Sequence, residues 1–229
     1  MNLHSIRGGS QKELEDKKYN IGIGISLGNK WFTTENIIEL VEWALQYSKD
    51  KVIVYVADLI HAINLEVRNK IPYEKALEKA DKKGNKILGE VKSEILKKIS
   101  VESANRIIFV KWSEIVDDKY KQKTEYLMSI YGKETDFQNS IHNLVKSFTA
   151  KEKRQFSDTE IHRLGEYIVE ELPEVINRVQ MGGIFCDAYA YPFDGELPKL
   201  VEDIQKGQLF PEIKEKIMDT EPKVFLEVR

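Results

Sequence analysis

One serine stands where a short apolar segment gives way to a polar turn. Ser26 lies in the segment Gly24-Ile25-Ser26-Leu27-Gly28, which matches the G-x-S-x-G pattern of the nucleophile turn in serine hydrolases. A serine hydroxyl in such a turn can attack an acyl group and carry it as an ester. Gly22 and Gly24 also let another group approach the backbone closely, although a close contact between a helix and a strand explains an isolated Gly-x-Gly equally well.

The context of Ser26 argues against a serine hydrolase. In that fold several strands precede the serine and the triad histidine comes late in the chain, whereas here one strand precedes Ser26 and no histidine follows His162. A dinucleotide site also fits poorly, because Gly22, Gly24 and Gly28 do not give the G-x-G-x-x-G pattern. The sequence around Ser26 therefore favours a chemistry other than that of a serine hydrolase or a dinucleotide-binding enzyme.

Further polar side chains lie on a helix that we expect over residues 158–172. Tyr167, Glu171 and Glu174 follow one another at i, i+4 and i+7, which places them on one stripe beside the apolar face. Pro173 removes one backbone hydrogen bond, so we expect the helix to end or kink there and its carboxylates to gain exposure. On spacing alone, this stripe is a solvated helix face.

The elements that position these side chains alternate between strands and helices. Strands are expected over residues 20–25, 51–57, 106–112, 183–191 and 223–228, the last at an edge. Helices are expected from about residue 34, and over residues 73–99, 113–131, 134–153, 158–172 and 197–204. Nearly continuous apolar runs such as residues 51–57 are typical of parallel strands that are covered on both faces. The pattern predicts an α/β fold with a mostly parallel sheet, helices on both faces and a single domain.

Composition limits the class of protein further. The 229 residues are 41% hydrophobic and 32% charged, and no apolar run approaches the roughly 20 residues of a transmembrane helix. We expect a polar lead at residues 1–18, without a signal-peptide core, and one domain at residues 19–229, which favours a cytoplasmic location. A single cysteine, Cys186, excludes an internal disulfide, and the four histidines show no metal-ligand spacing, so we expect neither a metal nor a cofactor.

A basic stripe lies on the longest expected helix, residues 73–99. The net charge of −3 argues against nucleic-acid binding by bulk charge, so such binding would need a local patch. Five lysines of this helix share one face: Lys75, Lys79, Lys82, Lys83 and Lys86. Acidic residues lie beside them, and spacing alone favours a solvated face with i,i+4 pairs.

Three of these features together resemble the cyclodipeptide synthases. They are Ser26 after the first strand, the segment Tyr167-x-x-x-Glu171-Leu172-Pro173, and the pair Tyr191-Pro192, which resembles the subgroup with proline after the tyrosine. The resemblance covers residues 21–192. It implies a Rossmann-like domain similar to the catalytic domain of class I aminoacyl-tRNA synthetases, and a reaction that joins the amino acids of two aminoacyl-tRNAs into a diketopiperazine. The HIGH and KMSKS signatures of ATP-using synthetases are absent from the sequence, as suits a substrate that arrives already activated.

The resemblance also implies roles for individual residues. Ser26 would carry first an aminoacyl group and then a dipeptidyl group, by a ping-pong route. Tyr167 and Glu171 would hold the ammonium group of the bound amino acid, with Glu171 as proton acceptor. Tyr191 would position the acyl group or stabilise the oxyanion, and Asn29 would hold the catalytic turn. The sequence offers no conventional base for Ser26.

By the same resemblance, Gly24, Glu174 and Tyr189 would line the pocket of the first amino acid. An unpaired buried carboxylate is costly, so Glu174 would need a donor or a positive charge from the loaded side chain. Histidine is the leading candidate, followed by other polar or cationic residues. Alternatively, Pro173 turns Glu174 out to solvent.

The lysine stripe would contact tRNA phosphates. Two other functions stay open, namely a non-catalytic module that binds aminoacyl-tRNA and, less favoured, a Rossmann-like esterase. The sequence predicts no oligomeric state.

Overall fold

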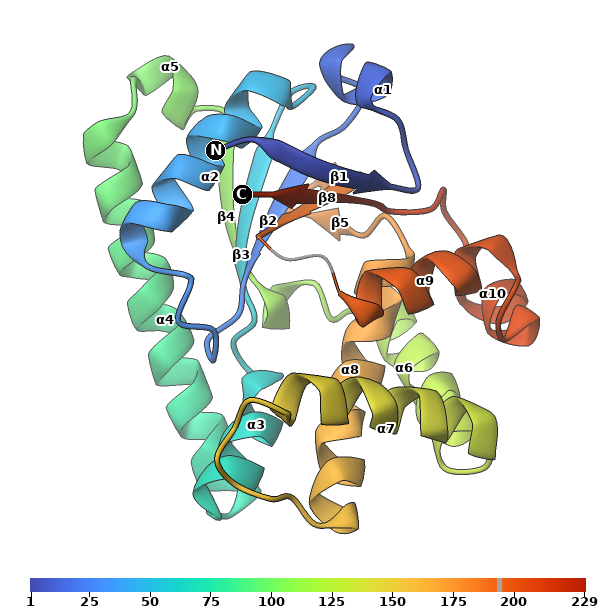
Figure 1. The fold of residues 1–229 in the computed structure, drawn as a ribbon. Coiled ribbons are helices and arrows are strands. Elements are labelled where there is room, and N and C mark those ends of the chain that lie inside the picture. The colour runs from blue at the N-terminus through green and yellow to red at the C-terminus, as the bar shows by residue number, and fades with distance from the viewer. Residues whose placement is uncertain (193–194) are drawn as a thin grey trace.

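A six-stranded sheet forms the centre of the molecule (Figure 1). The structure is a computed structural model that describes residues 1–192 and 195–229. The strand order is β1-β8-β7-β2-β3-β4, in which β1 alone is antiparallel to its neighbour. The strands are β1 (Leu3–Arg7), β2 (Ile21–Ile25), β3 (Val52–Val56), β4 (Ile107–Lys111), β7 (Ala188–Tyr191) and β8 (Val224–Val228). The predicted α/β fold with a mostly parallel sheet is therefore confirmed.

Helices cover both faces of this sheet (Figure 1). On one face, α2 (Thr34–Tyr47) and α4 (Tyr73–Lys98) pack against alternate strand residues such as Val52 and Val54. The opposite side of β3 presents Ile53 and Tyr55 to the other face, because successive side chains of a strand point in opposite directions. The helices there are α3 (His61–Asn69), α6 (Asp118–Tyr131), α7 (Thr135–Thr149), α8 (Asp158–Ile176), α9 (Glu196–Lys206) and α10 (Pro211–Ile217).

Short elements complete the chain. They are α1 (Gln11–Glu15), α5 (Val101–Ala104), a 3-10 turn at Trp112–Glu114, and a hairpin of β5 (Gln180–Met181) and β6 (Ile184–Phe185). Within residues 1–192 and 195–229, no helix has both the length and the apolar character needed to cross a membrane.

Two strand predictions need correction. The segment at residues 223–228 does not lie at the predicted edge, because β1 pairs outside β8, with Ile6 opposite Leu226. The polar lead at residues 1–18 thus contributes a strand to the sheet. The strand expected over residues 183–191 is divided into β6 and β7, because Asp187 turns inward and its Oδ2 accepts a 2.8 Å hydrogen bond from the backbone of Asn20.

The helix α8 continues through Pro173 to Ile176, so the predicted end of the helix at the proline is wrong. Ser157 caps its start by accepting a hydrogen bond from the backbone of Glu160. Beyond the proline the last turn is held because Val175 and Ile176 are buried, and Asn177 Nδ2 donates to the Pro173 carbonyl at 2.9 Å. Packing therefore outweighs the loss of one backbone hydrogen bond.

At Gly84 the helix α4 packs closely against Asp58, which lies just beyond the end of β3. A Cβ atom at position 84 would lie 2.6 Å from Asp58 Cβ and 3.3 Å from Asp58 Cα. We expect Gly84→Ala to destabilise the protein by about 1–3 kcal/mol, because the helix must move away from the strand end. Gly89→Ala is the matched control on the same helix, where nothing lies within 4 Å. It should raise the free energy of unfolding by about 0.5–1 kcal/mol in urea denaturation, and equal stability of the two variants would contradict this packing.

Candidate active site

The turn after β2 carries Ser26, which is the first residue beyond the strand and is partly buried. Asn29 holds this turn through three hydrogen bonds. Its backbone nitrogen donates to the Ser26 carbonyl at 3.2 Å, and its Oδ1 accepts from the Trp31 backbone at 2.9 Å. Its Nδ2 donates to the Tyr191 hydroxyl at 3.3 Å. Asn29 thus fastens the turn after β2 to the end of the neighbouring strand β7.

Tyrosine rings fill the space beside Gly24. Tyr189 and Tyr191 lie on the same side of β7, and their rings are stacked with centroids 5.4 Å apart. A Cβ atom at Gly24 would lie 2.7 Å from the Tyr189 hydroxyl and 2.9 Å from Tyr55 Cζ. The glycine is therefore required by the close approach of two rings. Pro192, which follows Tyr191 as the chain leaves the sheet, is buried.

Tyr167 and Glu171 face this region from α8. Burial raises the pKa of Glu171 to about 8, with the nearby charge of Glu174 adding to this effect and that of Lys223 opposing it. Among the described residues, none makes a hydrogen bond or ion pair to the Glu171 carboxylate. Burial also holds the pKa of Tyr167 well above its usual value, and the Glu171 charge raises it further. The site thus combines a neutral phenol with a carboxyl group that titrates near neutral pH.

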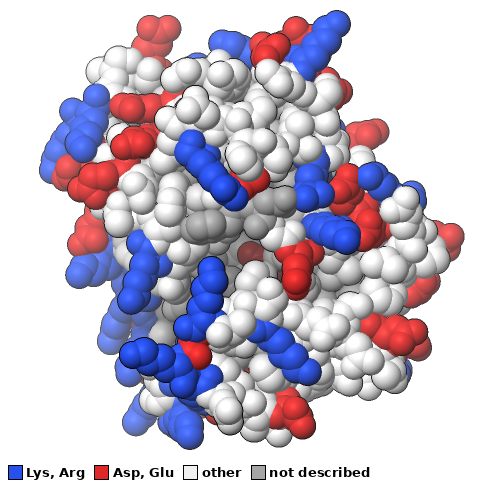
Figure 2. Space-filling model, in the orientation of Figure 1, with Lys and Arg blue, Asp and Glu red and all other residues white. Residues whose placement is uncertain are grey.

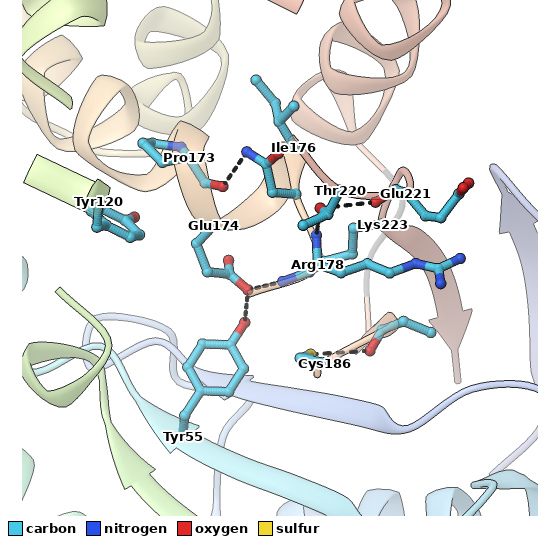
Figure 3. A network of polar contacts seen from close by, with 12 residues as sticks. Tyr55, Tyr120, Pro173, Glu174, Ile176, Arg178, Cys186, Thr220, Glu221 and Lys223 are labelled. Carbon is cyan, nitrogen blue, oxygen red and sulfur yellow. Dashed lines mark hydrogen bonds and ion pairs between the residues drawn. The ribbon is translucent and has the colours of Figure 1, made fainter. Parts of the chain in front are cut away.

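Glu174 is 1% exposed, so neither the predicted gain in exposure nor the outward turn is present. Its Oε1 accepts a 3.1 Å hydrogen bond from the Tyr55 hydroxyl and forms a very short ion pair with Lys223 Nζ (Figure 3). The premise that this carboxylate is unpaired is therefore wrong. Sequence reasoning missed both partners, because they are 119 and 49 residues away in the chain and share no spacing with Glu174.

The lysine stripe of α4 divides into two parts. Exposed members are Lys75, Lys79, Lys82 and Lys86. Figure 2 shows basic side chains along the side of the molecule where α4 lies. Lys83 instead points toward the turn after β2, where its Nζ donates to the Leu27 carbonyl at 2.5 Å, and burial lowers its pKa.

His61 also lies against this turn, although no pattern in the sequence assigns it a function. A Cβ atom at Gly28 would lie 3.3 Å from His61 Cε1. Burial lowers the pKa of His61 to about 4, and the charges of Lys83 and Arg68 act in the same direction. The imidazole is therefore neutral at physiological pH. Across residues 1–192 and 195–229, no group of three or more histidine, cysteine or acidic residues is placed to hold a metal ion.

The arrangement is suited to acyl transfer with an amine. The turn that carries Ser26 is joined by Asn29 to Tyr191, and the charge of the Glu171 carboxyl group acts on Tyr191. This carboxyl group can exchange a proton near neutral pH, and the neutral phenols can donate hydrogen bonds. The turn after β2, the end of β7 and the inner face of α8 supply these groups.

Comparisons with known proteins agree on one family. The profile of the family described as cyclodipeptide synthase matches residues 9–205. The fold is similar to that of a cyclodipeptide synthase from Bacillus thermoamylovorans, with a TM-score of 0.70 and 19% identity over 96% of this chain and 91% of that chain. A cyclodipeptide synthase from Candidatus Glomeribacter gigasporarum bound to Phe-tRNAPhe gives a TM-score of 0.57 and 16% identity over 96% of this chain and 93% of that chain.

A tyrosyl-tRNA synthetase from Archaeoglobus fulgidus, complexed with L-tyrosine, has a TM-score of 0.55 and 15% identity over 95% of this chain and 57% of that chain. The predicted similarity to the class I synthetase fold is thereby confirmed. Among curated protein sequences, none matches this chain. The family profile covers most of the sequence, and the chain belongs to the cyclodipeptide synthase family.

Proposed function

We propose that this protein joins the amino acids of two aminoacyl-tRNAs into a cyclic dipeptide, through an aminoacyl ester and then a dipeptidyl ester of Ser26. The observation that supports this most directly is the position of Ser26 in the turn after β2, which Asn29 joins to Tyr191 at the end of β7. The carboxyl group of Glu171 on α8 lies close enough for its charge to raise the pKa of Tyr191. Ser26 Oγ attacks the ester carbonyl of the first substrate, and its proton leaves with the hydroxyl of the released tRNA. This exchange keeps the acyl group activated without ATP.

Glu171 and Tyr167 then hold the amino group of the serine-linked amino acid. Glu171 takes a proton from that group, and the amine attacks the ester carbonyl of the second aminoacyl-tRNA. The new amide bond leaves a dipeptide on Ser26 and frees the second tRNA. The terminal amine closes on the serine ester in an intramolecular step, which benefits from a high effective concentration and regenerates the hydroxyl.

Tyr191 is suited to the oxyanion that forms in each step. Its hydroxyl accepts a hydrogen bond from Asn29 Nδ2, which orients the ring relative to the catalytic turn. Burial raises the pKa of Tyr191 to about 12, so the phenol stays protonated and can donate to a developing negative charge.

The direct test is to express the protein in bacteria and to analyse the medium by mass spectrometry for cyclic dipeptides that an empty-vector culture lacks. Because the substrates are aminoacyl-tRNAs, we expect the reaction in the cytoplasm. Binding of aminoacyl-tRNA without any cyclic product would instead indicate the non-catalytic module. Cleavage of small acyl esters by the purified protein without tRNA would indicate the esterase.

The same product analysis tests which amino acid is loaded first. The prediction of histidine requires an unpaired Glu174, but Lys223 and Tyr55 supply the donors that the substrate would otherwise bring. Products made only of aliphatic or aromatic residues would overturn histidine as the first amino acid. Products that contain histidine would retain it and would show that Glu174 is not its recognition partner.

The exposed lysines of α4 are expected to contact tRNA phosphates. Replacing Lys79, Lys82 and Lys86 by alanine should weaken tRNA binding and reduce the salt dependence of log K by about 0.7–0.9 for each phosphate left without its lysine. Lys97→Ala is the control, since this exposed lysine on the same helix pairs with Glu94 at 2.6 Å. Lys83→Ala should lower the reaction rate and leave the salt slope nearly unchanged, because Lys83 holds the catalytic turn. Equal salt slopes for the triple variant and the wild type would show that the stripe is only a solvated face.

A further inference from the structure

Lys223 is a lysine with no exposed surface, and it immediately precedes β8. Its ammonium group pairs with Glu174 Oε1, which also accepts the hydrogen bond from Tyr55 (Figure 3). The pair joins α8 to β8, while Tyr55 adds β3. A buried ion pair requires this kind of mutual compensation, because either charge alone would be costly away from water. Lys223 lies beyond residues 9–205, which the family profile matches.

The ion pair separates the roles of two neighbouring carboxylates. Glu171 and Glu174 are three residues apart on α8 and therefore lie on the same side of the helix. Glu174 is tied by two donors, whereas the described residues provide no hydrogen bond or ion pair to Glu171. One carboxylate is thus fixed in the wall of the site, and the other is left to react.

We propose that Lys223 is a positioning residue, which holds Glu174 in the wall so that Glu171 alone receives the amino group of the substrate. This inference rests on the proposed function for the identity of that amino group. The ammonium group of Lys223 acts in two ways. It prevents Glu174 from competing for the substrate's positive charge, and it offsets the repulsion that Glu174 would otherwise exert on an ionised Glu171.

The other titratable groups around Glu171 are neutral in the working pH range. The charge of Glu171 acts on five tyrosines, and burial raises the pKa of each of them. They are Tyr167 on α8, Tyr55 on β3, Tyr120 on α6, and Tyr189 and Tyr191 on β7. Burial likewise raises the pKa of Cys186 to about 11. Although burial opposes a charged lysine, the ion pair with Glu174 and the nearby charge of Asp187 raise the pKa of Lys223. Lys223 and Glu174 are therefore the charges that act on Glu171.

The test is the replacement Lys223→Met, which keeps an unbranched side chain of similar length, one atom shorter, and removes its charge. Without the positive charge, ionisation of Glu171 becomes less favourable. We expect the titration midpoint of Glu171, followed by NMR of protein labelled with 13C-glutamate, to move up by about one pH unit. The Glu171→Gln variant lacks the NMR signal of Glu171 and thereby assigns it. When the rate of product formation is measured against pH, its rise on the acid side should also move to higher pH.

A second variant separates this effect from a loss of folding. Lys223→Met combined with Glu174→Gln removes both charges and keeps an acceptor for Tyr55, so the midpoint should return toward the wild-type value. Lys206→Met is the matched control, because it breaks an exposed ion pair with Glu202 and should leave Glu171 unchanged. Circular dichroism establishes that each variant is folded.

An unchanged Glu171 midpoint in folded Lys223→Met protein, or a double variant that fails to return, would overturn the inference. The NMR titration does not depend on catalysis. A wild-type protein that makes no cyclic dipeptide would therefore disprove the proposed function alone.

Discussion

Ser26→Ala is expected to abolish cyclic dipeptide formation, with a loss of roughly 10⁴-fold or more, because in the proposed route the Ser26 hydroxyl carries the acyl group between the two tRNAs. Intact-protein mass spectrometry after incubation with aminoacyl-tRNA should show one added aminoacyl mass on the wild type and none on the variant. The fold should persist. Ser26 is partly buried and its hydroxyl makes no hydrogen bond to the described residues, so we expect a stability change within about 0.5 kcal/mol.

Ser93→Ala is a suitable control for this experiment, since Ser93 is exposed on α4 and far along the helix from the catalytic turn. It should keep both the added mass and the product. If Ser26→Ala still formed cyclic dipeptides at a rate near that of the wild type, the covalent route would have to be abandoned in favour of direct transfer between two bound substrates.

Glu171→Gln is expected to lower the rate by about 10²–10⁴-fold while leaving the first acylation intact. Glutamine keeps the shape of the side chain but cannot accept a proton from the amine, so the aminoacyl ester of Ser26 should accumulate. Mass spectrometry should then show a larger fraction of acylated protein than in the wild type. Glu170→Gln, at the next position of α8, should leave both quantities unchanged.

The pH dependence provides a second check on Glu171. Because its pKa in the folded protein is about 8, the ionised fraction grows with pH over the physiological range, and the rate should rise from about pH 6 to pH 8. Stability should change in the opposite direction. Burial raises the pKa of this carboxyl group, so folding favours the protonated form, and the free energy of unfolding should fall as the pH rises toward 8. Glu171→Gln should remove this part of the decrease, and identical stability profiles of variant and wild type would contradict the raised pKa.

The sequence predicted the elements whose residues carry a strong local signal. The apolar run of β3 and the regular apolar stripe of α4 each identify one element without reference to the rest of the chain. The strand β1 carries no such signal, because it is short, partly exposed and paired on one side. Its pairing depends on β8, which lies more than 200 residues later in the sequence.

Predictions from local sequence rules were wrong where tertiary packing determines the structure. Pro173 indicates a break by its own chemistry, yet the buried residues after it keep the helix in place. Spacing on α8 placed Glu171 and Glu174 on one side of the helix, but it could not show that Glu174 is paired by Lys223. Contacts between residues distant in sequence leave no periodic pattern in either segment, and the charge balance of the site depends on such contacts.

The late position of Lys223 has a consequence for synthesis on the ribosome. Every other residue assigned to the site lies between Gly24 and Pro192, whereas the partner of Glu174 emerges afterwards together with β8. Until then Glu174 has no counter-charge, and two carboxylates on α8 repel each other in a region that is not yet closed from water. A nascent chain that already carries Ser26 and Glu171 therefore lacks the charge balance of the finished site, which is complete only when β8 has joined the sheet.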